Sequence, residues 1–149
     1  MPYNQLLRED LNHIFINTID LWHFLDNKSI FITGGTGFIG CWLLESLLYL
    51  VEEKGLNIRI VILTRNHERF KKKAPNLAND PNLKFIEGDV RDFTFPTGNF
   101  DYVIHAAADS STGLDKTNPL LMFDTIVQGT RHVLNFAIQS GISKFLYII

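Results

Sequence analysis

Short apolar runs alternate with longer amphipathic stretches along most of the chain. Short runs bounded by polar, Gly or Pro residues predict strands, whereas apolar residues at helical spacing predict helices. The predicted strands are 29–33, 57–65, 83–89, 100–108 and 144–149. The predicted helices are 37–55, 66–74 and 119–139, and the Pro- and Asn-rich segment 75–82 is expected to be a loop.

The first part of the chain predicts one amphipathic helix, from about Asn4 to Phe24. Its apolar residues recur at helical spacing: Leu7, Leu11, Ile14, Phe15, Leu21, Trp22 and Leu25. We expect this helix to dock on the domain that follows, through Trp22 and its neighbours. Asn27 and Lys28 are expected to form the turn between the two.

Strand–helix–strand alternation predicts an α/β domain over 28–149, with 1–27 as a helical extension. Short apolar strands joined by helices are typical of a parallel sheet that is covered on both faces. Because such crossovers are right-handed, we expect a Rossmann-like doubly wound parallel sheet with strand order 3-2-1-4-5. No helix follows the fifth strand, so the sequence predicts an incomplete version of this fold.

Three glycines directly follow the first predicted strand. Gly34, Gly37 and Gly40 stand three residues apart where the next helix begins. Gly34 is expected to allow the tight turn, Gly37 to let a pyrophosphate approach the backbone, and Gly40 to let the helix pack close to the sheet. The N–H groups at the helix start would favour phosphates. The alternative is a glycine turn that merely joins a strand to a helix.

Charge and hydropathy exclude several kinds of partner. Sixteen acidic and fourteen basic residues give a net charge of −2, which favours neither nucleic acid nor an anionic membrane. The basic run 71–73, beside Arg69, is interpreted as a solvated helix end. The longest apolar stretch, 43–51, is too short to span a bilayer, and the acidic N-terminal region is not a secretory signal. We therefore expect a cytoplasmic protein.

Cysteine and histidine give no indication of a metal site. The single cysteine, Cys41, cannot form a disulfide within the chain and is interpreted as a buried small residue rather than a reactive thiol. The histidines show no metal-ligand spacing: His13, His23, His67, His105 and His132. No metal is expected.

The glycine spacing and three other stretches resemble one enzyme family. Thr33 and the glycines form T-G-x-x-G-x-x-G, which resembles the fingerprint of the extended short-chain dehydrogenase/reductases, the NAD-dependent epimerase/dehydratase group that works on nucleotide sugars. The stretches EGDVRD, VIHAAA and GTRHVLNFAIQSGISKFLYII agree with this family. The resemblance covers 28–149 and looks most like the nucleotide-sugar 4,6-dehydratases or epimerases.

The resemblance implies a dinucleotide site. In this family the pyrophosphate lies against the glycine turn and helix start, Asp89 and Val90 would meet the adenine, and the end of the fourth strand passes the ribose and phosphates. The expected cofactor-binding residues are Gly34, Thr36, Gly37, Phe38, Ile39, Gly40, Arg65, Asp89, Val90, His105, Ala106 and Ala107.

The end of the second predicted strand bears on the choice between NAD and NADP. An acidic side chain there suits a free ribose hydroxyl, and an arginine suits a 2′-phosphate. This chain has Thr64, Arg65 and Asn66, with no acidic residue before Glu68. Arg65 therefore favours NADP over NAD. Stacking of Arg65 on adenine, or a simple exposed charge, are the alternatives.

The catalytic residues that the family would require are missing from this sequence. The family places a tyrosine, and a lysine four residues later, on a helix after the fifth strand. Tyr3, Tyr49, Tyr102 and Tyr147 are the tyrosines here, and none is followed by lysine at that spacing. No catalytic residue is therefore expected. The segment 109–111 follows the fourth strand near the family's substrate position, and a plain loop is an equal alternative.

We therefore expect the N-terminal NAD(P)-binding portion of a nucleotide-sugar epimerase or dehydratase, inactive by itself. The complete enzyme would oxidise a hexose carbon with bound NAD(P)+, later return the hydride, and form a homodimer. In that case 119–139 would be one of the pairing helices, and the chain alone could self-associate. One alternative is a non-catalytic NAD(P)-binding sensor or interaction module. Another is a reductase of the family that acts on a non-sugar carbonyl.

Overall fold

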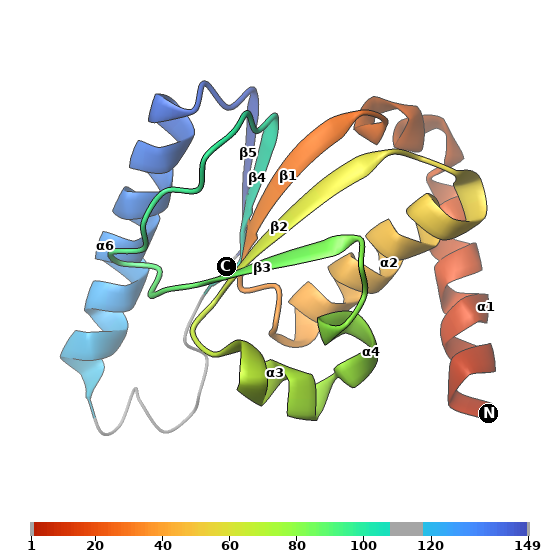
Figure 1. Ribbon diagram of the computed structural model, residues 1–149, viewed down its shortest axis with the longest axis horizontal. Helices are drawn as coiled ribbons and strands as arrows, with labels where there is room; N and C mark the ends of the chain where they lie inside the picture. Colours follow the sequence, from red (N-terminus) through yellow and green to blue (C-terminus); the bar gives the residue numbers. More distant parts are fainter. Residues whose placement is uncertain (1, 108–117, 149) are drawn as a thin grey trace.

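The computed structural model describes residues 2–107 and 118–148 and contains one parallel sheet (Figure 1). The strands are β1 (Lys28–Thr33), β2 (Ile58–Thr64), β3 (Leu83–Glu87), β4 (Tyr102–His105) and β5 (Lys144–Tyr147). They lie in the order β3-β2-β1-β4-β5, and every pair is parallel. The predicted Rossmann-like doubly wound sheet is confirmed. The predicted segment 109–111 lies outside the described residues.

Alternate side chains of the strands point to opposite faces of the sheet, so the sheet separates two cores. Ile30 and Ile32 of β1 pack with α2 (Phe38–Lys54) on one face. Phe31 packs on the other face with α6 (Pro119–Gln139), where its ring lies 4.8 Å from that of Phe136. Figure 1 shows α6 alone on its side of the sheet, and the other helices on the opposite side. Both faces of the central strands are therefore buried.

The two long helices have the ends that the sequence predicts. Gly55 ends α2 in the left-handed conformation, with φ of 66°, which glycine adopts without a steric penalty. Pro119 stands in the first turn of α6, and the side chain of Asn118 accepts a hydrogen bond from the Leu121 N–H. These signals fix where each helix meets the sheet.

The N-terminal segment differs from the single helix that the sequence predicts. It forms α1 (Pro2–Asn17) and a separate 3-10 helix, η1 (Ile19–Leu25). The break falls at Thr18, whose hydroxyl donates to the Ile14 carbonyl at 2.5 Å. The chain then turns so that Trp22 packs against the buried core on the α2 face of the sheet. The hydrophobic spacing continues across the break, which explains why the sequence pattern misses it.

Several contacts join α1 to α2. Leu11 is buried, the Phe15 ring lies 6.2 Å from that of Tyr49, and the Lys54 ammonium lies over the Phe15 ring. The exposed Arg8 also pairs with Glu53. Burial of the apolar side chains supplies more stabilisation than this pair, because exposed ion pairs contribute little.

The segment after β2 contains two short helices, α3 (His67–Lys73) and α4 (Pro75–Ala78). The sequence predicts only a loop where α4 lies. Pro75 stands in its first turn, a position where the missing N–H costs nothing, and Leu77 and Ala78 are buried in the core. Burial of these two residues therefore overrides the turn-forming composition around them.

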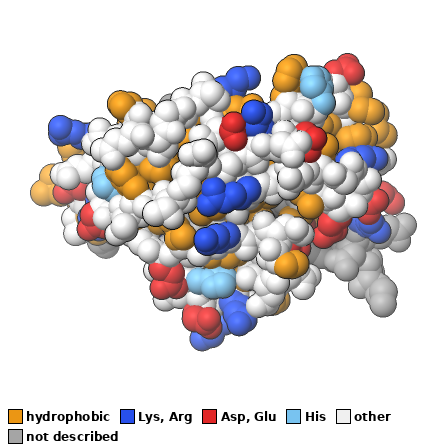
Figure 2. All heavy atoms as spheres, turned by 45° about the horizontal axis from the view of Figure 1, so that its top comes forward, with side chains coloured by type: hydrophobic (Ala, Val, Ile, Leu, Met, Phe, Trp, Pro, Cys, Tyr) orange, Lys and Arg blue, Asp and Glu red, His pale blue; other side chains and the backbone are white. Residues whose placement is uncertain are grey.

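Positively and negatively charged side chains are both scattered over the face seen in Figure 2, with hydrophobic ones between them. This mixed surface agrees with the small net charge of −2. Within 2–107 and 118–148, no helix is both long enough and apolar enough to cross a membrane.

Candidate functional site

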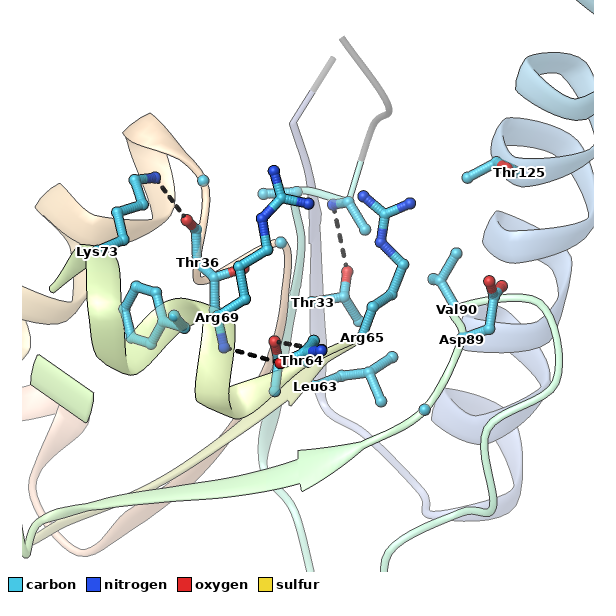
Figure 3. Close-up of a pocket in the computed structure, with 17 residues that line it drawn as sticks. Thr33, Thr36, Leu63, Thr64, Arg65, Arg69, Lys73, Asp89, Val90 and Thr125 are labelled. Carbon is cyan, nitrogen blue, oxygen red and sulfur yellow. Dashed lines mark hydrogen bonds between the residues drawn. The ribbon is translucent and has the colours of Figure 1, made fainter. Parts of the chain in front are cut away.

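A cavity of about 480 Å³ lies at the carboxyl ends of the strands (Figure 3). The order of the sheet reverses here, between β1 and β4, which is where open α/β sheets bind ligands. The residues that line this cavity, which we call the strand-end pocket, are Thr33, Gly34, Thr36, Gly37, Leu63, Thr64, Arg65, Asn66, Arg69, Phe70, Lys73, Gly88, Asp89, Val90, Ala106, Ala107 and Thr125.

The glycine turn brings bare backbone to the pocket. Gly34 has φ of 74°, and a Cβ added there would lie 2.2 Å from the Ala106 carbonyl oxygen. A Cβ on Gly40 would lie 2.3 Å from the Gly34 carbonyl oxygen, so Gly40 packs against the turn itself rather than against the sheet. Gly37 is exposed at the N-cap position of α2 and carries no capping side chain. The first N–H groups of α2 are therefore suited to hold an anion.

Not all predicted residues of the turn line the pocket. Thr36 does, but Phe38 and Ile39 point their side chains into solvent, with exposed fractions of 78% and 50%. Gly40 is buried behind the turn. The pocket therefore receives Gly34, Thr36 and Gly37 directly, and the other three glycine-motif positions shape the turn or project outward.

One wall of the pocket is basic. Arg65 directly follows β2, and Arg69 and Lys73 lie four and eight residues further along, on α3. Figure 3 shows Arg65 and Arg69 side by side, with both guanidinium groups directed up into the pocket. The Lys73 ammonium donates to the Thr36 carbonyl at 3.0 Å, which joins α3 to the glycine turn. Three cationic side chains, from the end of β2 and from α3, therefore line the cavity.

The opposite wall carries Asp89 and Val90, as the sequence predicts. The Asp89 carboxylate accepts from Arg91 Nε at 2.8 Å and Nη2 at 2.9 Å. These side-chain hydrogen bonds from Arg91 hold the pKa of Asp89 below its ordinary value. Thr125, from α6, closes this side of the pocket. A charged carboxylate therefore lines the pocket near Arg65, whose charge also contributes to the lowered pKa of Asp89.

The structure brings Ala106 and Ala107 to the pocket but not the His105 ring. His105 is fully buried, and its two ring nitrogens contact the hydroxyls of Thr33, at 2.6 Å, and Thr130, at 3.0 Å. Burial lowers the pKa of His105 to about 4, so the ring is neutral near pH 7. Its place is behind the pocket, between β1 and α6.

Sequence reasoning misses several residues of this site. Arg69 and Lys73 line the pocket, although the basic run is interpreted from sequence as a solvated helix end. That interpretation fits Lys71 and Lys72, which are exposed and do not line the cavity. The missed signal is the spacing of four residues from Arg69 to Lys73, which places both on one side of α3, the helix that follows Arg65.

The pocket fits a dinucleotide with an anionic centre. Glycine backbone and the start of α2 suit a pyrophosphate, and the guanidinium groups of Arg65 and Arg69 add positive charge to the same pocket. No group of three potential metal ligands occurs in the parts of the chain that the structure describes. Cys41, in the first turn of α2, is half-buried, and burial raises the pKa of its thiol.

Comparison with known sequences gives a consistent result. The UDP-N-acetylglucosamine 4,6-dehydratase (inverting) of Campylobacter jejuni is 30% identical over 122 residues, and the dTDP-D-glucose 4,6-dehydratase of Mus musculus is 30% identical over 127 residues. These alignments cover 80% and 81% of this chain but only 35% of each relative. The chain thus spans about a third of the length of the curated relatives it matches.

Solved structures of related enzymes share the fold. DesIV, a dTDP-glucose 4,6-dehydratase from Streptomyces venezuelae solved with NAD and TYD bound, is 26% identical with a TM-score of 0.61, over 78% of this chain and 38% of that chain. A UDP-glucose 4-epimerase is 29% identical with a TM-score of 0.61, over 80% and 34%. A model of the NAD dependent epimerase/dehydratase family matches residues 30–149, and this chain therefore belongs to that family.

Proposed function

We propose that this chain is the N-terminal NADP-binding portion of a nucleotide-sugar dehydratase or epimerase. Residues 28–149 would form the dinucleotide-binding domain and 1–27 an extension docked on it. The relatives named above are dehydratases and epimerases of nucleotide sugars, which supports this substrate class. In the complete enzyme, the bound dinucleotide would accept a hydride from a hexose carbon and later return it.

The observation that carries the proposal is the chemistry of the strand-end pocket. Bare backbone at Gly34 and Gly37 would hold the pyrophosphate, while Asp89 and Val90 would lie beside the adenine. Arg65 and Arg69 would hold the 2′-phosphate that distinguishes NADP from NAD. A pocket for NAD typically places an acidic side chain at the end of β2, where this chain has Thr64, Arg65 and Asn66.

Catalysis requires more than this chain supplies. No tyrosine of the sequence has a lysine four residues later, so the proton-transferring pair of the family is not among these 149 residues. We propose that the chain alone binds dinucleotide without turning over a nucleotide sugar. A non-catalytic sensor or interaction module is the rival function, and the sequence that follows Ile149 in the gene separates the two.

Two further properties that we expect of this protein stay predictions. A homodimer agrees with the exposed apolar side chains along α6, which are Leu120, Phe123, Val127, Leu134 and Ile138. A cytoplasmic location agrees with the absence of a membrane-crossing helix from the described part of the chain.

The cofactor preference is tested by substitution of Arg65. We expect the wild-type chain to bind NADPH more tightly than NADH, measured by titration calorimetry. Arg65→Ala should weaken NADPH binding about tenfold or more, because the 2′-phosphate then loses a hydrogen bond from a charged group. NADH binding should change much less, because NADH has no 2′-phosphate. Equal losses for both dinucleotides, or no loss for NADPH, would overturn the assignment of NADP.

A further inference from the structure

His105 stands at the centre of a buried chain of polar contacts behind the strand-end pocket. It lies on β4, next to β1 and β5, and its side chain has no exposed surface. Nδ1 lies 2.6 Å from the Thr33 hydroxyl oxygen and Nε2 lies 3.0 Å from the Thr130 hydroxyl oxygen. Tyr147 of β5 stacks on the ring, with centroids 5.3 Å apart. Both nitrogens of a ring shielded from water are thus bonded.

The Thr33 hydroxyl is shared between two partners. Its oxygen accepts from the Ala107 N–H at 3.3 Å, and its second lone pair and its proton remain for Nδ1 of His105, so the contact forms in either tautomer of the ring. Nε2 pairs with the Thr130 hydroxyl, which can likewise donate or accept. The chain runs from the Ala107 amide through Thr33 and His105 to α6.

Both ends of this chain are next to the pocket. Thr33 and Ala107 line it, and the Ala106–Ala107 backbone is packed so closely on Gly34 that no Cβ would fit between them. At the other end, Thr130 follows Gly129, whose Cα side packs on Val90 of the opposite wall. One imidazole therefore joins the glycine turn, the end of β4 and α6, which border three sides of the cavity.

We propose that His105 is a positioning residue of the strand-end pocket, which sets the spacing between the glycine turn and α6 by holding Thr33 with one ring nitrogen and Thr130 with the other. His105 does not touch the ligand and acts through Thr33 and Ala107. The identity of the ligand rests on the proposed function, whereas the positioning role rests on the hydrogen bonds alone. The ring is neutral in this role, because a positive charge in a site shielded from water is costly.

The first test needs no ligand. Amide hydrogen exchange is measured in the full chain for wild type, His105→Phe, Thr33→Val and the matched control His132→Phe. His132 lies on α6, like Thr130, and its Nε2 contacts the Phe93 carbonyl at 2.9 Å, but it does not line the pocket. We expect the Ala107 amide to exchange at least tenfold faster in the first two variants, with amides in the middle of β2 unchanged. Unchanged exchange at Ala107 in both variants overturns the positioning role.

The second test separates positioning from general support of the fold. Nitrogen-15 spectra of wild type should show both ring nitrogens of His105 in hydrogen bonds, and Thr33→Val should shift the Nδ1 signal. NADPH binding should weaken about tenfold in His105→Phe and Thr33→Val. It should recover in part in His105→Asn, whose amide can reach the position of Nδ1.

The two proposals fail in different ways. Failure of wild type to bind any dinucleotide overturns the proposed function, and the exchange and nitrogen-15 measurements still decide the role of His105. An Nδ1 signal that Thr33→Val leaves unchanged, or NADPH binding equal in wild type and His105→Phe, overturns the role of His105. The thermal midpoint of each variant without ligand shows whether that variant is folded. If His105→Phe does not fold, Thr33→Val is used for the same comparisons.

Discussion

Arg69 and Lys72 are close in the sequence and belong to the same short helix, but they have different surroundings. Arg69 lines the strand-end pocket beside Arg65, whereas Lys72 is exposed and does not border the cavity. The proposed 2′-phosphate would lie between the two guanidinium groups that Figure 3 shows side by side. This pair of residues separates the effect of pocket geometry from the effect of charge alone.

Arg69→Ala should weaken NADPH binding about tenfold, while Lys72→Ala should change it by less than twofold, because each removes one positive charge but only Arg69 faces the pocket. Titration at low and at moderate salt measures both. A similar loss in the two variants would mean that the basic segment attracts the dinucleotide only through its overall field.

At this scale, the sequence predicts the backbone contributors to the site better than the side chains. Gly34, Gly37, Ala106 and Ala107 reach the pocket because strand ends and turns are set by local sequence. His105 does not, since the direction of a side chain on β4 depends on which neighbours the sheet brings to it. Motif position alone does not distinguish a residue that lines a cavity from one that supports it.

At the scale of elements, the pocket depends on how closely α6 approaches the loop after β3. Gly129 is buried in α6, and a Cβ there would lie 2.8 Å from Cγ1 of Val90. Val90 in turn lines the pocket with little freedom to move, as only 7% of its surface is exposed. A methyl group on Gly129 would therefore push Val90 toward the cavity or push α6 outward.

Gly129→Ala should lower the free energy of unfolding by about 1–2 kcal/mol, because overpacking outweighs the better helix propensity of alanine. It should also weaken dinucleotide binding, since the wall that holds Val90 moves. Urea denaturation and NADPH titration measure the two effects. Asn135→Ala, at an exposed position of the same helix, is the control. It should leave the free energy of unfolding unchanged or slightly higher, and NADPH binding unchanged.

The sequence predicts the long elements well and the short ones poorly. Periodicity and end signals define α2 and α6 almost to the residue, and both helices cover buried sheet faces. The break at Thr18 and the helix α4 depend on contacts with the core, through Trp22 and Leu77. Hydrophobic spacing shows which residues are buried, but it does not show where the backbone must turn to bury them.

Across the whole molecule, one buried group links the pocket to stability. The hydrogen-bonded partners of His105 lie on β1 and α6, so a charge on the buried ring disturbs contacts between the sheet and α6. The groups around it are the Thr33 and Thr130 hydroxyls and the rings of Phe145 and Tyr147. No neighbouring carboxylate is among these contacts to favour the charged ring.

The free energy of unfolding should therefore fall as the pH is lowered from 6.5 to 4. Burial lowers the pKa of His105 from 6.5 to about 4, so in this window the unfolded chain takes up a proton that the folded chain does not. The full loss is about 3 kcal/mol, and the slope from His105 fades within about one pH unit above pH 6.5 and below pH 4.

Urea denaturation at intervals between pH 7.5 and 4 measures this slope, and His105→Asn should flatten it.

Glu45 acts in the opposite direction, because burial raises the pKa of its carboxyl and the folded state then gains protons before the unfolded state. Glu45→Gln should therefore make the decline steeper. Asp89 and Asp101, whose pKa values are lowered by hydrogen bonds from Arg91 and from the Ser29 N–H, lose their contributions only below about pH 4. A wild-type curve that stays flat between pH 6.5 and 4, with Glu45→Gln also flat, would show that the His105 ring accepts a proton without disturbing the fold.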